Sequence, residues 1–105
     1  MTDWKTFDGW DNWLEPFELE GARVVMCCSA CPEAYDVFLN EERIGYMRLR
    51  GGRFYAAHPD VGGRTVYEHQ FDDSWQGWFS SEERAQHLPL AIKALKERHA
   101  HEQST

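Results

Sequence analysis

The spacing of apolar and polar residues divides the chain into a middle with strand patterns and a helical end. In the middle, short apolar or alternating runs are separated by turn residues, which is typical of antiparallel strands. These runs cover residues 23–28, 34–40, 43–50, 53–58 and 64–71. Gly51-Gly52, between two of the runs, is a strong hairpin signal. The pattern predicts an antiparallel β-meander of four to five strands over residues 23–71.

Alternation within a strand assigns its side chains to the two faces of the sheet. In the run 43–50 it places Ile44, Tyr46, Arg48 and Arg50 on one face, and Gly45, Met47 and Leu49 on the other. We therefore expect one face of this strand to be rich in arginine and tyrosine.

A helical segment is predicted over residues 80–99. Ser80, with Glu83 three residues later, forms a capping box at its start. An apolar stripe follows at the spacing of a helix that lies on a sheet: Leu88, Ala91, Ile92 and Leu95. Pro89 removes one backbone hydrogen bond, which predicts a kinked or broken helix at that point. Residues 100–105 are polar and are expected to fray.

Residues 1–22 form an acidic, Trp-rich lead-in to the predicted sheet. Trp10, Trp13 and Phe17 recur at helical spacing after Asp8, a residue that can cap a helix, and Pro16 keeps this segment short. With 105 residues, the chain has the length of one domain. The sequence thus predicts a single small α+β domain over residues 1–105: a Trp-rich helical segment, a β-meander and a C-terminal helix.

Composition limits the class of protein. A hydrophobic fraction of 42% is too high for a disordered chain, even with a net charge of -7. No apolar run reaches the roughly 18 to 20 residues of a membrane span, and the start lacks the layout of a signal peptide. Three clustered cysteines are a poor disulfide framework and suit a reducing compartment. We expect a cytoplasmic protein that does not enter a membrane.

The net charge is unevenly distributed along the chain. Residues 1–42 carry ten acidic and two basic residues, whereas residues 43–69 carry five arginines and two acidic residues. The two regions can neutralise each other within the fold, or one of them can present a face of a single sign to a partner.

The Arg-rich middle suggests nucleic-acid binding. The predicted hairpin combines arginines with aromatic residues: Tyr46, Arg48, Arg50, Arg53 and Tyr55. Guanidinium groups bind phosphates and aromatic rings stack on bases, so this composition suits single-stranded nucleic acid. The sequence pI of about 5.1 opposes that interpretation.

Cys28-x-x-Cys31 has the spacing of half a zinc site, and a complete site needs two further ligands, such as histidines from elsewhere in the chain. Free cysteines that pack as small apolar residues explain the same spacing. No Gly-rich phosphate loop and no catalytic signature is present, so we expect a non-enzymatic protein without a cofactor.

A pattern of short motifs resembles a group of small, uncharacterised bacterial and phage proteins. The motifs run from Cys31-Pro32-Glu33 through Tyr35-Asp36-Val37-Phe38, Gly45-Tyr46, Arg48-Leu49-Arg50 and Phe54 to Phe79 and Glu83-Arg84. The resemblance implies a compact α+β fold and a role as an accessory protein of a phage or mobile element. It implies no activity and no catalytic residue.

The leading hypothesis is an accessory protein that binds another protein. Carboxylates alternate with large rings in the lead-in: Asp8, Trp10, Asp11, Trp13 and Glu15. Trp side chains are frequent interface anchors, and carboxylates would direct the chain to a basic surface. Such surfaces are typical of nucleic-acid enzymes, so the protein could inhibit or modulate one. Alternatively, the Trp rings complete the core of the domain itself.

Overall fold

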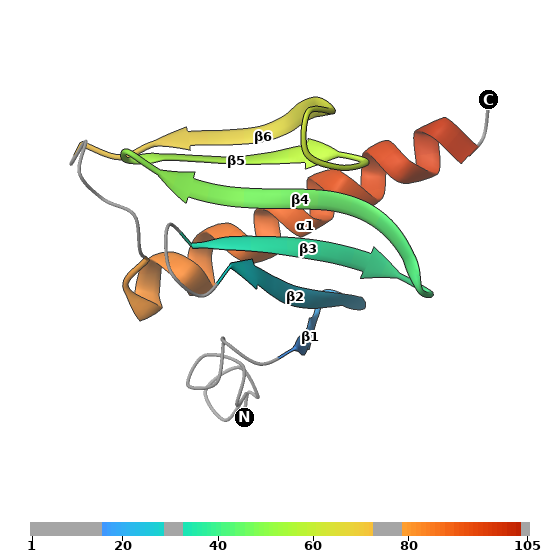
Figure 1. The fold of residues 1–105 in the computed structure, drawn as a ribbon, viewed down its shortest axis with the longest axis horizontal. Coiled ribbons are helices and arrows are strands. Elements are labelled where there is room, and N and C mark those ends of the chain that lie inside the picture. The colour runs from blue at the N-terminus through green and yellow to red at the C-terminus, as the bar shows by residue number, and fades with distance from the viewer. Residues whose placement is uncertain (1–15, 29–32, 73–78, 104–105) are drawn as a thin grey trace.

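The structure is a six-stranded antiparallel sheet with one long helix against one of its faces (Figure 1). The computed structural model describes residues 16–28, 33–72 and 79–103. The strands are β1 (Phe17–Leu19), β2 (Ala22–Cys28), β3 (Ala34–Leu39), β4 (Glu42–Arg50), β5 (Arg53–His58) and β6 (Arg64–Gln70). Each pairs with the next along the chain. The helix α1 (Ser81–Gln103) runs obliquely behind the sheet.

Tight turns set the order of the strands. The turns β1–β2, β3–β4 and β4–β5 each contain two consecutive residues with positive φ, which is the geometry of type I′ hairpins. At Gly51-Gly52 these φ angles are 61° and 79°, and the flanking Arg50 and Arg53 pair directly. The hairpin predicted from Gly51-Gly52 is therefore confirmed, as are an α+β fold and an antiparallel sheet.

The number of strands and the helical placement of Phe17 were predicted wrongly. The sheet has six strands rather than four to five, because Phe17–Leu19 forms the edge strand β1. Phe17 was placed in a helix from its spacing relative to Trp10 and Trp13. Pairing of Phe17 with Val24 instead buries its ring in the core. Residues 1–15 lie outside the described residues, and with them Asp8, Trp10 and Trp13.

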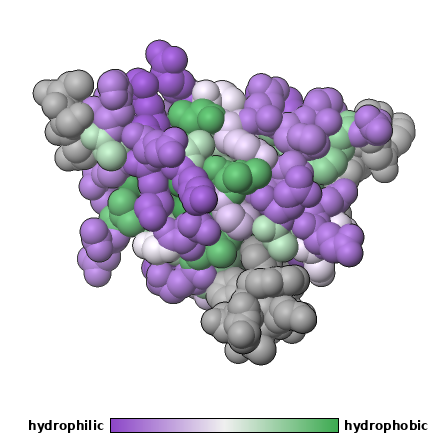
Figure 2. Space-filling view, turned by 180° about the vertical axis from the view of Figure 1, so that it is seen from behind, coloured by the Kyte–Doolittle hydropathy of each residue, from purple (hydrophilic) through white to green (hydrophobic). Residues whose placement is uncertain are grey.

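The C-terminal helix is one continuous element of 23 residues that includes Pro89. A break near Pro89 was expected because proline removes a hydrogen bond at a cost of about 3 kcal/mol. Leu88, Ala91 and Ile92 are fully buried on both sides of it, and this contact with the sheet holds the helix together. The helix also continues through the predicted frayed tail as far as Gln103. The molecular face on the side of the helix is largely hydrophilic (Figure 2).

The core lies between the sheet and α1, and a bulge in β4 alters the predicted alternation. Val37 pairs with Gly45 and Phe38 pairs with Arg43, so Ile44 is the extra residue on β4. Ile44 is therefore buried in the core, whereas strict alternation had placed it with Tyr46 and the arginines. Gly45 allows close approach of the helix, because a Cβ at this position would lie 2.4 Å from Leu95 Cδ2.

A buried ion pair connects the start of β3 to the start of α1. Glu33 and Arg84 are only 1% and 3% exposed, with Arg84 Nε 2.9 Å from Glu33 Oε2 and Nη2 3.1 Å from Oε1. The Glu33 carboxylate also accepts hydrogen bonds from the Tyr35 hydroxyl and the Phe79 amide. Burial lowers the pKa of Arg84, but the hydrogen bonds and charge of Glu33 raise it by more. Burial, reinforced by the Glu33 charge, raises the pKa of Tyr35, which keeps its hydroxyl protonated. The capping box between Ser80 and Glu83 is confirmed directly beside this pair.

Gly45→Ala is expected to destabilise the protein by about 1–3 kcal/mol, because the new methyl group collides with the fully buried Leu95. In the double variant with Leu95→Ala the methyl group gains space. Urea unfolding measures the loss in free energy of unfolding of each variant. The losses of the two single variants, added together, should exceed the loss of the double variant by at least about 1 kcal/mol. Leu88→Ala, two helical turns away, serves as the control and should combine additively with Gly45→Ala. Additivity with Leu95→Ala would contradict the close approach.

Glu33→Gln is expected to lower the free energy of unfolding by about 3–5 kcal/mol, because it leaves the Arg84 charge buried without a carboxylate. Arg84→Met should have a similar effect for the reverse reason. The double variant should lose much less free energy of unfolding than the two single variants together, since it buries no charge at either position. Urea unfolding of the three variants measures this coupling, and purely additive losses would show that the two side chains act independently.

Candidate nucleic-acid interface

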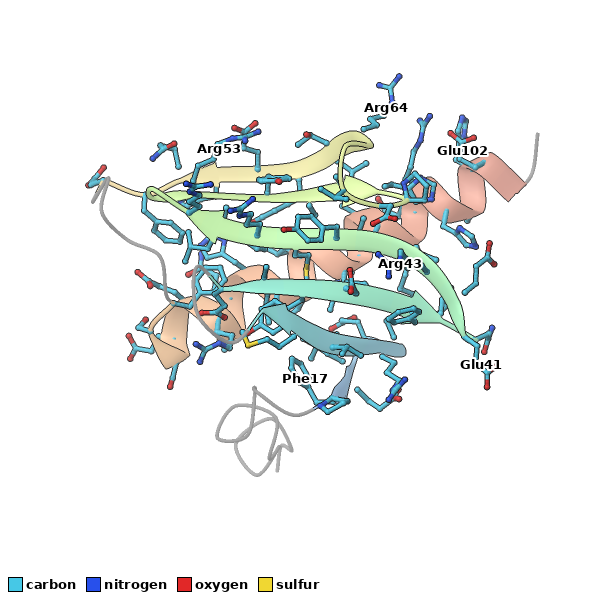
Figure 3. The ribbon with its side chains drawn as sticks, viewed as in Figure 1. Phe17, Glu41, Arg43, Arg53, Arg64 and Glu102 are labelled. Atoms are coloured by element: carbon cyan, nitrogen blue, oxygen red, sulfur yellow. The ribbon has the colours of Figure 1, made fainter. Side chains whose placement is uncertain are left out.

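The β4–β5 hairpin brings the predicted arginines and tyrosines together on the face of the sheet opposite α1. The apolar residues Met47, Leu49 and Phe54 are fully buried on the helix side. The alternate residues Arg48, Arg50, Arg53 and Tyr55 face the other way. Arg48 pairs with Tyr55, and Arg50 with Arg53, so their side chains are direct neighbours across the two strands. Figure 3 shows Arg53 on this side of the hairpin.

Four of the five predicted residues line one shallow hollow of about 220 Å³: Arg48, Arg50, Arg53 and Tyr55. The fifth, Tyr46, lies beside it, with its ring centre 6.3 Å from that of Tyr55 and the two rings tilted by 56°. Both rings are partly exposed. The cluster predicted from sequence therefore exists as one surface, which we call the hairpin face.

The arginines of the hairpin face differ in their bonding. Arg53 forms an ion pair with Glu68 of β6, and its guanidinium lies 4.6 Å from the centre of the Tyr55 ring. Neither Arg48 nor Arg50 forms an ion pair with any described residue, and Arg50 is exposed. The Arg48 Nε atom is buried and has no hydrogen-bond partner. The hairpin face thus holds one neutralised arginine and two that have no carboxylate partner in the part of the chain that the structure describes.

Internal pairing of the acidic and basic regions occurs, but it is partial. Arg43 contacts Asp36 from the acidic region at 3.1 Å and Asp60 at 2.8 Å. Burial raises the pKa of Asp36, and Asp60 adds to this, while Arg43 opposes it. The Val61 amide, followed by Arg43, lowers the pKa of Asp60. Among the described residues, this pairing neutralises Arg43 but leaves Arg48, Arg50 and Arg64 without carboxylate partners.

Sequence reasoning missed Glu68, the carboxylate that neutralises Arg53. The residue lies opposite Tyr55, and this position depends on how β5 and β6 align. A bulge between Ala56 and Ala57 shifts that alignment, so counting from the turn would have misplaced the partner. The available signal was Glu68 itself, a carboxylate in the next predicted strand after Arg53.

The other predicted sites are not tested by the structure. Asp8, Trp10, Asp11, Trp13 and Glu15 lie outside the described residues, so binding of a protein partner through them stays a prediction. For zinc, Cys31 also lies outside them, and Cys28 is described only in its backbone. The described residues contain no group of three or more side chains able to hold a metal.

Comparisons with protein-family models, with curated proteins and with solved structures find no match to this chain. The resemblance to small bacterial and phage proteins therefore stays an expectation. Within the described ranges, no helix is long and apolar enough to cross a membrane.

Proposed function

We propose that the protein is a non-enzymatic binding protein that holds single-stranded nucleic acid on the hairpin face. The observation that carries this proposal is the juxtaposition of Arg48 and Arg50, which lack carboxylate partners among the described residues, with two neighbouring tyrosine rings. Guanidinium groups bind phosphate through forked hydrogen bonds, and exposed rings stack on unpaired bases. Arginine and tyrosine together therefore match the phosphate and the base, the two repeating parts of a single-stranded nucleic acid.

The unpartnered Arg48 Nε atom supports a bound anion at this place. A buried donor without an acceptor is unfavourable by about 1–3 kcal/mol, so a phosphate oxygen that reached Arg48 would remove an existing penalty. Arg53 is held by Glu68 and by the Tyr55 ring, which makes it a support for the ring rather than a phosphate ligand.

The shape of the face favours a single strand over a duplex. The hollow is shallow and is formed by side chains that lie across two adjacent strands. Stacking on Tyr46 or Tyr55 needs a base whose plane is accessible, and bases within a duplex are covered by their neighbours. We therefore expect single-stranded oligonucleotides to bind more tightly than a duplex of the same sequence.

The charge of the whole protein limits the affinity. A net charge of -7 repels a polyanion at long range, so binding depends on the local arginines. Two phosphate contacts on a single strand correspond to a slope of about -1.4 in a plot of log affinity against log salt concentration. This is a weak dependence for a nucleic-acid-binding protein.

Arg48→Gln and Arg50→Gln are each expected to reduce that salt slope by about 0.7, because each removes one phosphate contact. Lys93→Gln is the matched control, since Lys93 is exposed on α1, on the opposite side of the sheet. Fluorescence anisotropy with a labelled oligonucleotide of about ten bases, over a salt series, measures the slope. No binding at low salt, or equal slopes in all three variants, would rule out the proposal.

Tyr46→Leu and Tyr55→Leu are each expected to weaken binding about tenfold, since stacking on one ring contributes about 1–3 kcal/mol per base. Tyr46→Phe and Tyr55→Phe keep the ring and should restore most of the affinity at constant salt. The same anisotropy assay compares the four variants. If the Phe variants bind as weakly as the Leu variants, the hydroxyl groups rather than the rings make the contact, and the stacking component is wrong.

A further inference from the structure

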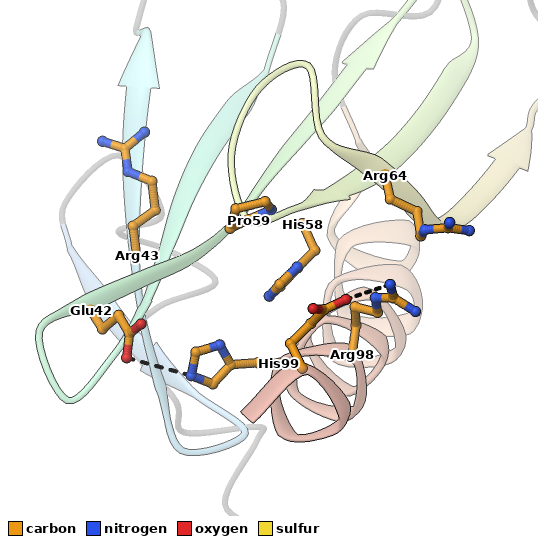
Figure 4. A pocket seen from close by; sticks show the side chains of 8 residues that line it. Glu42, Arg43, His58, Pro59, Arg64, Arg98 and His99 are labelled. Atoms are coloured by element: carbon orange, nitrogen blue, oxygen red, sulfur yellow. Dashed lines mark ion pairs between the residues drawn. The ribbon is translucent and has the colours of Figure 1, made fainter. Parts of the chain in front are cut away.

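A second hollow lies at the opposite end of the sheet from the Gly51-Gly52 turn, and the proposed function does not involve it. It has a volume of about 360 Å³. Its walls come from the start of β4, the end of β5, the start of β6 and the last turns of α1 (Figure 4). Residues far apart in the sequence therefore meet here, among them His58, Arg64 and Arg98.

Two buried side-chain nitrogens in this hollow have no hydrogen-bond partner among the described residues. They are Nε2 of His58 and Nε of Arg98, and with Arg48 Nε they are the unpartnered buried side-chain polar atoms found among the described residues. His58 is only 8% exposed, and its ring points into the space between the Glu42–His99 pair and Arg98 (Figure 4). Unpartnered buried polar atoms are unfavourable, and both nitrogens are donors when His58 is protonated, so their convergence on one hollow favours an anionic acceptor.

The charges around the hollow favour an anion, in contrast to the acidic protein as a whole. Three arginines and two glutamates line it, a net charge of +1 before either histidine is protonated. Both glutamates are engaged: Glu42 lies 3.5 Å from His99, and Glu102 pairs with Arg98. Arg64 is exposed and forms no ion pair with a described residue. The partnerless nitrogens of His58 and Arg98, and the exposed guanidinium of Arg64, all belong to groups that are positively charged or able to become so.

We propose that this hollow binds a phosphate group, with His58, Arg98 and Arg64 as its ligands. A tetrahedral dianion presents acceptor oxygens in several directions, which suits donors that come from a strand end, a helix and the neighbouring strand. The volume exceeds that of a single phosphate ion, so the site also accommodates a phosphate monoester. This proposal is independent of nucleic-acid binding on the hairpin face.

Protonation of His58 couples this site to pH. Burial, then the neighbouring His99, lowers the pKa of His58; Arg98 acts in the same direction, while Glu102 and Glu42 oppose it. The other charged groups that line the hollow are Arg43, held by Asp36 and Asp60, and Arg64. A bound dianion favours the protonated ring, so anion binding raises the pKa of His58. For an anion whose own charge does not change with pH, affinity therefore increases as the pH falls through the pKa of His58.

The test is an NMR titration of the histidine ring signals with inorganic phosphate. We expect the His58 signals to shift in a saturable manner at millimolar phosphate. Arg98→Gln should weaken binding at least tenfold and Arg64→Gln severalfold, whereas Lys93→Gln on the outer side of α1 should bind normally. Arg64 is exposed, so its variant keeps the test valid even if Arg98→Gln unfolds. Sulfate, which stays a dianion, serves for the pH series and should raise the pKa of His58.

Two further arms identify the ligand and separate the two proposals. A nucleoside monophosphate that binds more tightly than inorganic phosphate indicates a monoester ligand, and equal affinity indicates the free ion; both results support the site. The double variant Arg48→Gln, Arg50→Gln should keep phosphate binding, even where nucleic-acid binding is lost. Unchanged His58 signals in the unsubstituted protein, or normal binding by both Arg64→Gln and Arg98→Gln, would overturn the proposal.

Discussion

The Glu33–Arg84 ion pair joins the start of β3 to the first turn of α1 and sets how the helix meets the sheet. The Glu33 carboxylate accepts bonds from Arg84, from Tyr35 and from the Phe79 amide, so a charge that is nearly inaccessible to water is satisfied. Such a pair is weak evidence for net stability, but removing one partner is severely unfavourable. It therefore favours this one docking of the helix over others that would bury the same apolar stripe.

Because the helix docks on one side only, one face of the sheet is buried in the core and the opposite face is exposed. The helix side holds the core, where Gly45 allows the helix to come close at Leu95. On the opposite face the strands expose the hairpin face, with Arg48 and Arg50 unpaired among the described residues. The last turns of α1 pass the start of β4 and the end of β5, and there they enclose the hollow around His58. The hollow around His58 thus follows from the position of the helix, whereas the hairpin face is formed by β4 and β5 alone.

Sequence could predict the hairpin face because its geometry is local. A two-residue turn at Gly51-Gly52 fixes the pairing of Arg50 with Arg53, and alternation then places Arg48 beside Tyr55. The hollow around His58 and Arg98 could not be predicted in this way. His58 and Arg98 come together only because the helix crosses the sheet in one particular direction. No spacing of residues along the chain encodes the direction of that crossing. The motif residues Glu33, Tyr35 and Arg84 were noticed as a pattern, yet their convergence into one buried network was not.

The sequence by itself determined the strand-forming region predicted over residues 23–71, the Gly51-Gly52 hairpin and the capped start of the helix, since each depends on neighbouring residues. Tertiary structure decided three other features. Phe17 joins the sheet because Val24 and the core bury its ring. The helix continues through Pro89 because the buried residues on both sides outweigh one lost hydrogen bond. Ile44 turns inward at a bulge, where the core buries its side chain completely. In each case burial of apolar surface by distant residues overrides a local preference.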